Sequence, residues 1–222
     1  MRMLLTASGL RNPTIINALA EMLERPFAEC RVAIVLTASL VTEGDKSWVA
    51  DSIARISALG WQQLDLIELN AGPVELIERR LSGADVVYVA GGNQYFLADS
   101  IRARGLTTLF EDLASQKVYV GESAGAMIFC RPLAAGVATM GDEEELTSLG
   151  IENAEPVLPL LDWYLKPHLD SVSFPERTER WARERAAALG KPIWFIDDDT
   201  ALAVTDPSQD PIVVSEGSWL RL

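Results

Sequence analysis

The most informative stretch of the sequence reads Lys117-Val-Tyr-Val-Gly-Glu-Ser-Ala-Gly-Ala-Met-Ile-Phe-Cys130. It begins with an apolar run typical of a buried strand and ends in a run suited to a helix, and Gly-x-Ser-x-Gly, centred on Ser123, lies between them. In that context the pattern predicts a nucleophile elbow, a sharp turn that exposes the serine hydroxyl above a sheet. The alternative interpretation is a chance match in which Ser123 only caps a helix.

Apolar runs alternate with helical patterns through the first 130 residues. The expected buried strands are Met3–Thr6, Val32–Thr37, Leu64–Leu69, Asp85–Ala90 and Val118–Val120. The expected helices are Thr14–Leu23, Lys46–Leu59, Pro73–Leu81 and Gln94–Arg104. Strands that alternate with helices of this length predict an α/β fold in three layers, α/β/α, with a mostly parallel central sheet.

The sequence after Arg131 has a different character. It is irregular and acidic around Gly141–Glu145, and one charged helix is expected at about Pro175–Leu189. Short strand-like runs then close the chain, and we expect an antiparallel finish on the edge of the sheet. These runs are Pro192–Ile196, Ala201–Val204, Ile212–Val214 and Ser218–Leu222. Because no linker or repeat interrupts the chain, residues 1–222 are expected to form one domain.

A second glycine-containing segment, Ala90-Gly91-Gly92-Asn93, directly follows an expected strand. Loops at the carboxyl ends of parallel strands meet at the same edge of a sheet. The backbone N–H groups of Gly92 and Ala124 could therefore form a two-donor oxyanion hole beside Ser123. A structural interpretation is compatible with this one, in which the glycines form an ordinary turn and Asn93 is the N-cap of the next helix.

A serine nucleophile needs a base, and the sequence contains a single histidine, His168, in Lys166-Pro167-His168-Leu169-Asp170-Ser171. We therefore expect His168 to be the base, although a lone histidine is more often structural. The third member should be a carboxylate that orients the imidazole. The candidates are Asp142 first, Asp170 second, and Glu122 next to the nucleophile.

Composition narrows the choice of partners and cofactors. The 19 Lys and Arg against 32 Asp and Glu give a net charge of −13, which disfavours nucleic acid or an anionic membrane as a partner. One histidine and two distant cysteines, Cys30 and Cys130, disfavour a His/Cys metal site or a disulfide framework, so neither metal nor cofactor is expected. No signal peptide or long apolar segment is evident, which predicts a soluble, cytoplasmic protein.

The segments GGN, GESAGAM and PHLDS, in this order and separation, resemble the peptidase E and cyanophycinase family of serine peptidases. The resemblance implies a fold like class I glutamine amidotransferases, with serine in place of cysteine at the elbow. It implies that Ser123 is the nucleophile, His168 the general base and acid, and the amides of Gly92 and Ala124 the oxyanion hole. An acid between serine and histidine would be Asp142, but the local motif of the family is not reproduced there.

The resemblance also implies a substrate class. The aspartyl dipeptidases of the family act on peptides with an N-terminal Asp, and an arginine after the histidine is thought to meet that acidic side chain. Arg177 is the nearest match, and we expect Asn93 and Arg177 to bind substrate. A structural alternative exists here too, because Glu176–Arg180 and Glu179–Arg183 are i,i+4 charge pairs typical of a solvated helix face.

The expected function is hydrolysis of small peptides through a Ser-His-acid acyl-enzyme mechanism, in a monomer or homodimer. One alternative is hydrolysis of β-aspartyl or cyanophycin-derived peptides. The other is a non-catalytic binding or regulatory protein on the same scaffold, which the unmatched acid segment favours.

Overall fold

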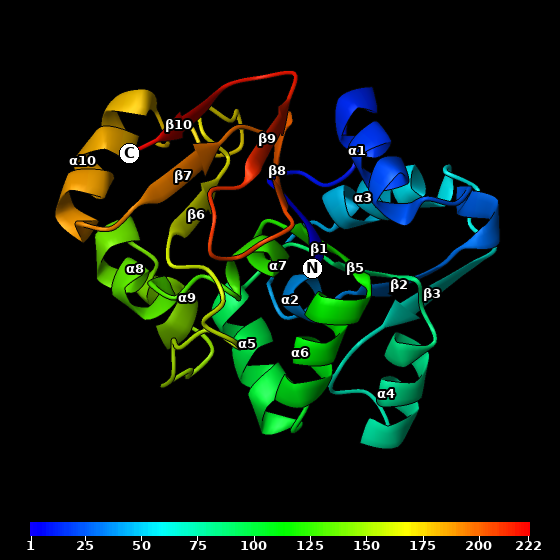
Figure 1. The fold of residues 1–222 in the computed structure, drawn as a ribbon. Helices are drawn as coiled ribbons and strands as arrows, with labels where there is room; N and C mark the ends of the chain where they lie inside the picture. The colour runs from blue at the N-terminus through cyan, green and yellow to red at the C-terminus, as the bar shows by residue number, and fades with distance from the viewer.

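The computed structural model describes residues 1–222 as a seven-stranded sheet with helices on both faces and a three-stranded sheet beside it (Figure 1). The strand order of the large sheet is β3-β2-β4-β5-β1-β8-β9. Its parallel strands are β1 (Arg2–Thr6), β2 (Arg31–Val35), β3 (Gln63–Ile67), β4 (Val86–Val89) and β5 (Val118–Glu122). The strands β8 (Thr200–Val204) and β9 (Ile212–Ser215) complete it in antiparallel pairing.

The three layers follow from strands that are apolar on both faces. Along β1, Met3 and Leu5 belong to one hydrophobic cluster, whereas Leu4 belongs to the cluster on the opposite face. The same alternation holds along β4, where Val87 and Val86 point to different clusters. Such strands need a helical layer on each side, because side chains alternate between the two faces of a sheet.

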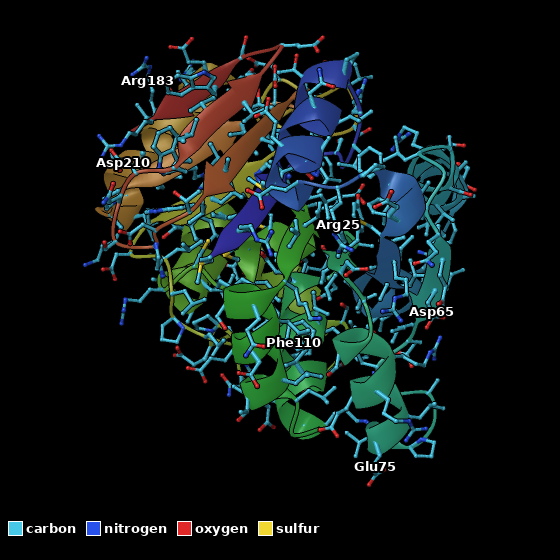
Figure 2. The ribbon with its side chains drawn as sticks, turned by 45° about the vertical axis from the view of Figure 1, so that its right-hand side comes forward. Arg25, Asp65, Glu75, Phe110, Arg183 and Asp210 are labelled. Carbon is cyan, nitrogen blue, oxygen red and sulfur yellow. The ribbon has the colours of Figure 1, made fainter.

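Helices α1 (Pro13–Leu23) and α3 (Ser47–Ser57) cover one face of the large sheet. The other face is covered by α4 (Val74–Ser82), α5 (Gln94–Ala103) and α6 (Thr107–Gln116). Figure 2 shows Phe110 of α6, which is fully buried, whereas the labelled Glu75, Arg183 and Asp210 lie at the surface. The expected three-layer α/β/α fold with a mostly parallel sheet is therefore confirmed, and the predicted early strands and helices lie within a few residues of the observed ones. The helix α6 was not predicted.

The second sheet corrects one prediction. Its order is β10-β7-β6, with β6 (Tyr164–Pro167) parallel to β7 (Ile193–Ile196) and β10 (Trp219–Arg221) antiparallel to β7. Only β8 and β9 of the four closing runs therefore extend the large sheet. The helix α10 (Glu179–Leu189) connects β6 to β7, so a separate βαβ unit forms beside the main sheet.

The remaining helices are short and lie around the junction of the two sheets. They are α2 (Thr37–Leu40), α7 (Ala124–Met127), α8 (Leu133–Met140) and α9 (Glu143–Thr147), and a 3-10 turn spans Phe27–Glu29. One hydrophobic cluster contains side chains of both sheets, for example Tyr119 and Leu165. The second sheet is thus packed against the first through a shared core. None of the helices combines the length and apolar character needed to span a membrane.

Candidate active site

Ser123 lies on a tight turn between β5 and α7, as the sequence predicted for an elbow. Its backbone has φ 48° and ψ −106°, a conformation that side-chain-bearing residues rarely adopt. The flanking glycines allow the close packing of this turn. A Cβ on Gly121 would lie 2.6 Å from the Gly125 carbonyl oxygen, and one on Gly125 would lie 2.1 Å from the Val89 carbonyl oxygen. Any side chain at either glycine would push α7 away from the sheet.

His168 lies directly after β6 and faces Ser123. Its Nε2 is 3.0 Å from the Ser123 Oγ, within hydrogen-bond distance. The imidazole stacks on Phe174, with ring centroids 4.6 Å apart, and its backbone has φ 69°. The ring stack and the contact with Oγ hold the imidazole against the hydroxyl, as a general base requires, and the surrounding structure maintains the positive φ of both residues.

Asp198 is the carboxylate that meets the other imidazole nitrogen. Its Oδ1 is 2.7 Å from His168 Nδ1. The parallel register of the second sheet brings the two residues together, because Pro167 at the end of β6 pairs with Ile196 at the end of β7. His168 and Asp198 lie in the turns that follow these two strand ends. Asp198 is not among the carboxylates predicted from the sequence.

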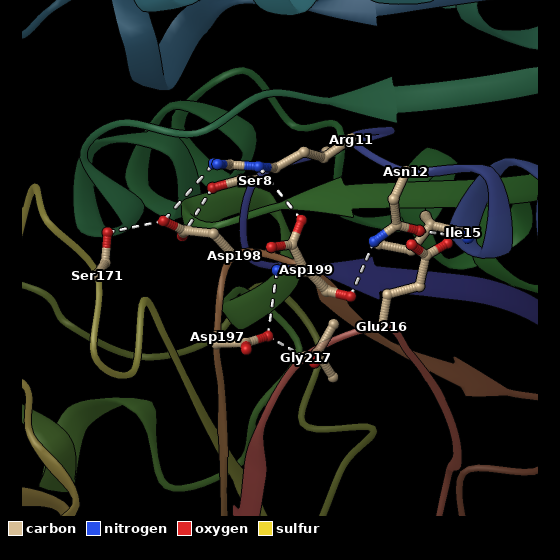
Figure 3. A network of polar contacts seen from close by, with 12 residues as sticks. Ser8, Arg11, Asn12, Ile15, Ser171, Asp197, Asp198, Asp199, Glu216 and Gly217 are labelled. Carbon is tan, nitrogen blue, oxygen red and sulfur yellow. Dashed lines mark hydrogen bonds and ion pairs between the residues drawn. The ribbon is translucent and has the colours of Figure 1, made fainter.

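Asp198 is held by a network of polar contacts (Figure 3). The Ser8 hydroxyl donates to Oδ1 at 2.8 Å and the Ser171 hydroxyl donates to Oδ2 at 2.7 Å, while the Arg11 guanidinium lies 3.8 Å from Oδ2. Arg11 also pairs with Asp199 at 3.3 Å. These contacts fix the direction in which the carboxylate faces the imidazole.

The expectation that Asp142 faces His168 is wrong. The Asp142 carboxylate is buried and accepts hydrogen bonds from the Lys166 ammonium group, 2.9 Å from each oxygen. Gln94 and Tyr95 also donate to Asp142, at 3.2 and 3.3 Å. Asp142 therefore neutralises a buried lysine instead of orienting the histidine.

The two alternative acids are also elsewhere. Glu122 is buried beneath the elbow and accepts hydrogen bonds from the Tyr88 hydroxyl at 2.6 Å and the Ser52 hydroxyl at 3.0 Å. Asp170 is exposed, and its backbone N–H donates to the Arg177 carbonyl at 2.8 Å. Neither carboxylate has a hydrogen bond to His168.

The electrostatics of the site favour a neutral imidazole. Burial lowers the pKa of His168 below its usual 6.5, and it outweighs the opposing effect of Asp198. Burial alone would raise the pKa of Asp198, but hydrogen bonds from His168 and Ser171 outweigh it and leave that pKa well below its usual range. At neutral pH the site therefore contains a neutral base beside an ionised aspartate, which is the arrangement a serine nucleophile requires.

The segment Gly91-Gly92-Asn93 lies beside the elbow. Gly92 has φ 128°, and a Cβ there would lie 2.1 Å from the Ala38 carbonyl oxygen, so only glycine fits. The N–H groups of Gly92 and Ala124 have no backbone acceptor. They are free to donate to a developing oxyanion, and their role in an oxyanion hole stays a prediction.

Asn93 is the N-cap of α5, as the structural interpretation of the sequence predicted. Its Oδ1 accepts from the Phe96 N–H at 2.9 Å, and its Nδ2 donates to the Glu145 carbonyl at 2.7 Å. The side chain joins the start of α5 to α9. Its contact with a substrate stays a prediction.

Arg177 does not line the catalytic cavity. Its guanidinium lies 3.8 Å from the centroid of Phe174 and donates to the Pro167 carbonyl at 3.2 Å. It precedes α10, whose N-cap is Thr178, so it is not part of the charged helix face. In this structure the Arg177 guanidinium packs on the Phe174 ring, which stacks on His168.

The cavity in front of Ser123 has a volume of about 530 Å³, which is enough for a short peptide. Ser123, His168 and Asp198 line it together with Gly91, Gly92 and Asn93. Its cationic side chains are Arg11 and Arg55, and its other carboxylates are Asp51, Glu122 and Glu145. The cavity therefore combines the catalytic constellation with charges of both signs.

The α/β/α scaffold carries a serine on a strained elbow, a histidine within hydrogen-bond distance of it, and an aspartate within hydrogen-bond distance of the histidine. This combination defines a class of proteins with a hydrolase-like site. Residues 3–211 match the model of peptidase family S51, and the chain belongs to this family. It is a peptidase, and the resemblance to peptidase E found in the sequence is confirmed.

Two relatives illustrate the range of similarity. An uncharacterised peptidase of Listeria monocytogenes is 32% identical over 158 residues, covering 70% of this chain and 73% of the relative. Peptidase E of Escherichia coli is 25% identical over 193 residues, covering 86% of this chain and 73% of the relative.

Two solved structures share the fold. A candidate peptidase E from Listeria monocytogenes superposes with a TM-score of 0.76 at 24% identity, covering 97% of this chain and 98% of that chain. A peptidase from an acI-B1 actinobacterium superposes with a TM-score of 0.68 at 17% identity, covering 100% of this chain and 93% of that chain.

Proposed function

We propose that this peptidase is a serine dipeptidase that cleaves short peptides by acyl transfer through Ser123. The observation that carries the proposal is the continuous contact from Ser123 Oγ to His168 Nε2, 3.0 Å, and from His168 Nδ1 to Asp198 Oδ1, 2.7 Å. The family's motif for the triad acid is not reproduced at Asp142, which was the reason to consider a non-catalytic protein. Asp198 removes that reason.

The first half of the reaction forms an acyl-enzyme. His168 Nε2 removes the proton of Ser123 as Oγ attacks the carbonyl carbon of the scissile peptide bond. The N–H groups of Gly92 and Ala124 stabilise the negative charge on the carbonyl oxygen. Asp198 accepts the hydrogen bond from Nδ1 and stabilises the imidazolium, which then gives its proton to the leaving amine as the C–N bond breaks.

The second half releases the acyl group. A water molecule takes the position of the departed amine, and neutral His168 removes its proton as the water attacks the ester carbonyl. The tetrahedral intermediate collapses, the ester bond to Ser123 breaks, and the proton on Nε2 returns to Oγ. The burial that lowers the pKa of His168 keeps the imidazole neutral and ready for each step.

The proposed substrates are peptides with an N-terminal Asp, as the relationship to aspartyl dipeptidases implies. The acidic side chain needs a cation in the cavity. Arg11 is engaged by Asp198 and Asp199, whereas Arg55 on α3 is exposed and takes part in no ion pair. Arg55 is therefore the guanidinium we assign to the substrate carboxylate, in place of Arg177.

The test of the nucleophile is hydrolysis of Asp-p-nitroanilide by the Ser123→Ala protein. Turnover should fall by about 10⁴-fold or more, because loss of a nucleophilic serine leaves only the residual catalysis of the binding site. Ser173→Ala is the matched control, since Ser173 lines the same cavity without touching the imidazole, and it should keep its turnover. Retained hydrolysis in Ser123→Ala would remove the proposal.

The test of the substrate class is a panel of α-Asp, β-Asp and non-acidic dipeptides. Faster cleavage of α-Asp-Leu than of β-Asp-Leu and Ala-Leu is expected. Preference for the β-linked peptide would favour the alternative, a hydrolase of β-aspartyl or cyanophycin-derived peptides. Cleavage of none of the three, with Ser123 unreactive, would favour a binding or regulatory protein.

A further inference from the structure

Glu145 is a carboxylate that the mechanism above does not use. It lies on α9, half-buried, and lines the catalytic cavity. Its backbone is tied to the oxyanion loop, because its carbonyl oxygen accepts from Asn93 Nδ2 at 2.7 Å. Its own carboxylate takes part in no ion pair or side-chain hydrogen bond of the structure. A half-buried carboxylate without a partner at a catalytic cavity is a place for a cationic group of a ligand.

The other carboxylates of the cavity are less suited to that task. Asp198 accepts hydrogen bonds from His168, Ser8 and Ser171, and Glu122 accepts them from Tyr88 and Ser52. The carboxylates of Asp198 and Glu122 therefore already have hydrogen-bond partners. Asp51 on α3 is exposed, so it is well hydrated and a pair with it would gain less than a pair with a half-buried group.

Glu145 also lines the same cavity as the nucleophile and the oxyanion loop, beside which the substrate's N-terminus must lie. The α-nitrogen of an N-terminal residue is two bonds from the carbonyl carbon, about 2.5 Å away by standard bond lengths. A group that binds it must therefore be close to the nucleophile and the oxyanion donors. A Cβ on Gly91 would lie 3.2 Å from Ser123 Cβ, and Asn93, two residues further on, donates to the backbone carbonyl of Glu145.

We propose that Glu145 binds the free α-ammonium group of the substrate and thereby restricts the enzyme to unblocked N-termini. The inference rests on the proposed peptidase function and adds the residue that selects an exopeptidase substrate. Arg55 and Glu145 lie on α3 and α9, which are on opposite sides of α7 in the view of Figure 1. One binds a carboxylate and the other an ammonium group, so the cavity matches a zwitterionic peptide.

The charges around Glu145 support this role. Burial and the neighbouring Asp142 raise the pKa of Glu145 to about 7, and they outweigh the Lys166 ammonium and the Arg177 guanidinium, which lower it. Without a ligand the carboxyl group is therefore close to half protonated at neutral pH. An ammonium group in contact with it would favour the ionised form, so binding should strengthen as the pH rises from about 6 to about 7. Above that range the gain is offset, because a peptide α-amino group loses its proton with a pKa of about 7.7 to 8.0.

The experiment compares Asp-p-nitroanilide with N-acetyl-Asp-p-nitroanilide in the wild-type protein, in Glu145→Gln and in Asp51→Asn. The wild-type protein should prefer the free amine by about 10- to 100-fold in kcat/KM, the range for loss of a charged hydrogen bond. In Glu145→Gln, kcat/KM should fall for the free-amine substrate and stay unchanged for the acetylated one, so that the preference is lost. Asp51→Asn removes the same charge from the same cavity and should keep it.

A binding arm separates this inference from the proposed function. Asp-Leu and N-acetyl-Asp-Leu are titrated calorimetrically into Ser123→Ala protein with and without Glu145→Gln. Tighter binding of the free amine that depends on Glu145 supports the inference even if the wild-type protein hydrolyses neither anilide, a result that would defeat the proposed function alone. Equal binding of the two peptides, no binding of either, or loss of the preference in Asp51→Asn as well would overturn the inference.

Discussion

Replacing Asp198 by Asn tests the residue that completes the site. The amide keeps the size of the side chain and removes its charge. If its NH₂ group donates to His168 Nδ1, the imidazole proton moves to Nε2, and Nε2 then has no lone pair to accept the proton of Ser123. In the Ser-His-Asp template this replacement lowers kcat by about 10⁴-fold, and at 1.36 kcal/mol for each tenfold step that corresponds to about 5.4 kcal/mol.

The fold should tolerate this change. The Ser8 and Ser171 hydroxyls can rotate to donate to the amide oxygen or to accept from its nitrogen. The expected cost in the free energy of unfolding is therefore only about 1.5 to 3 kcal/mol, the range for hydrogen bonds to a charged group. The assay is kcat from initial rates at saturating Asp-p-nitroanilide, with urea unfolding of the same preparation.

Asp142→Asn is the matched control, because Asp142 was the acid expected from the sequence. It breaks the buried pair with Lys166, whose side chain is only 2% exposed, and should cost about 3 to 5 kcal/mol of stability. Where it stays folded, its kcat should remain within about tenfold of the wild-type value. If Asp198→Asn keeps more than about a tenth of the wild-type kcat, or if folded Asp142→Asn loses as much as Asp198→Asn, the assignment of Asp198 is wrong.

Three further predictions concern the base, the oxyanion loop and the substrate cation. Because burial lowers the pKa of His168 below 6.5, kcat at saturating substrate should stay constant as the pH falls from about 8 and decline only below about pH 6.5, since a bound ammonium group keeps Glu145 ionised in the complex. A decline in kcat that begins near pH 8 would contradict this. Gly92→Ala should lower kcat by about 10²- to 10³-fold, because a Cβ 2.1 Å from the Ala38 carbonyl must displace the loop, whereas Gly105→Ala, also at positive φ but in open space, should cost only about 1 kcal/mol of stability in urea unfolding. Arg55→Gln should raise KM about tenfold for Asp-Leu but not for Ala-Leu, and equal changes for the two peptides would refute its role.

Most helices and strands of the first 130 residues could be predicted because local sequence signals and tertiary structure agree there. Strands such as Val86–Val89 are uniformly apolar, and the elbow around Ser123 is recognisable from two glycines and its position between strand and helix. These features depend on neighbours along the chain. Ser123 and the segment Gly91-Gly92-Asn93 could therefore be located from the sequence alone, and His168 could be located because it is the single histidine.

The region after Arg131 depended on contacts between distant residues. The strand Tyr164–Pro167 contains a lysine and a proline, and it is buried only because Lys166 pairs with Asp142, 24 residues earlier. A lysine in a buried strand gives no periodic signal, so β6 and with it the second sheet were missed. For that reason all the closing runs were expected to lie in one sheet, in antiparallel pairing.

The acid was missed because the expected chain order was serine, acid, histidine. The structure instead places Asp198 after His168 in the sequence, in the run Asp197-Asp198-Asp199 that directly follows β7 (Ile193–Ile196). Three aspartates at the end of a buried strand were a usable signal, since functional side chains gather at strand ends. Which of the three faces the imidazole depends on the pairing of β6 with β7.

The assignment of Ser123 as the nucleophile is tested by locating the residue that a fluorophosphonate probe modifies. The modified residue is identified by mass spectrometry of the peptides, and the extent of labelling is compared with residual turnover. Stoichiometric labelling of Ser123 is predicted, with activity lost in proportion to the label and no label in Ser123→Ala. Activity lost through labelling of another residue, or full turnover by protein labelled at Ser123, would contradict the claim that Ser123 is the nucleophile.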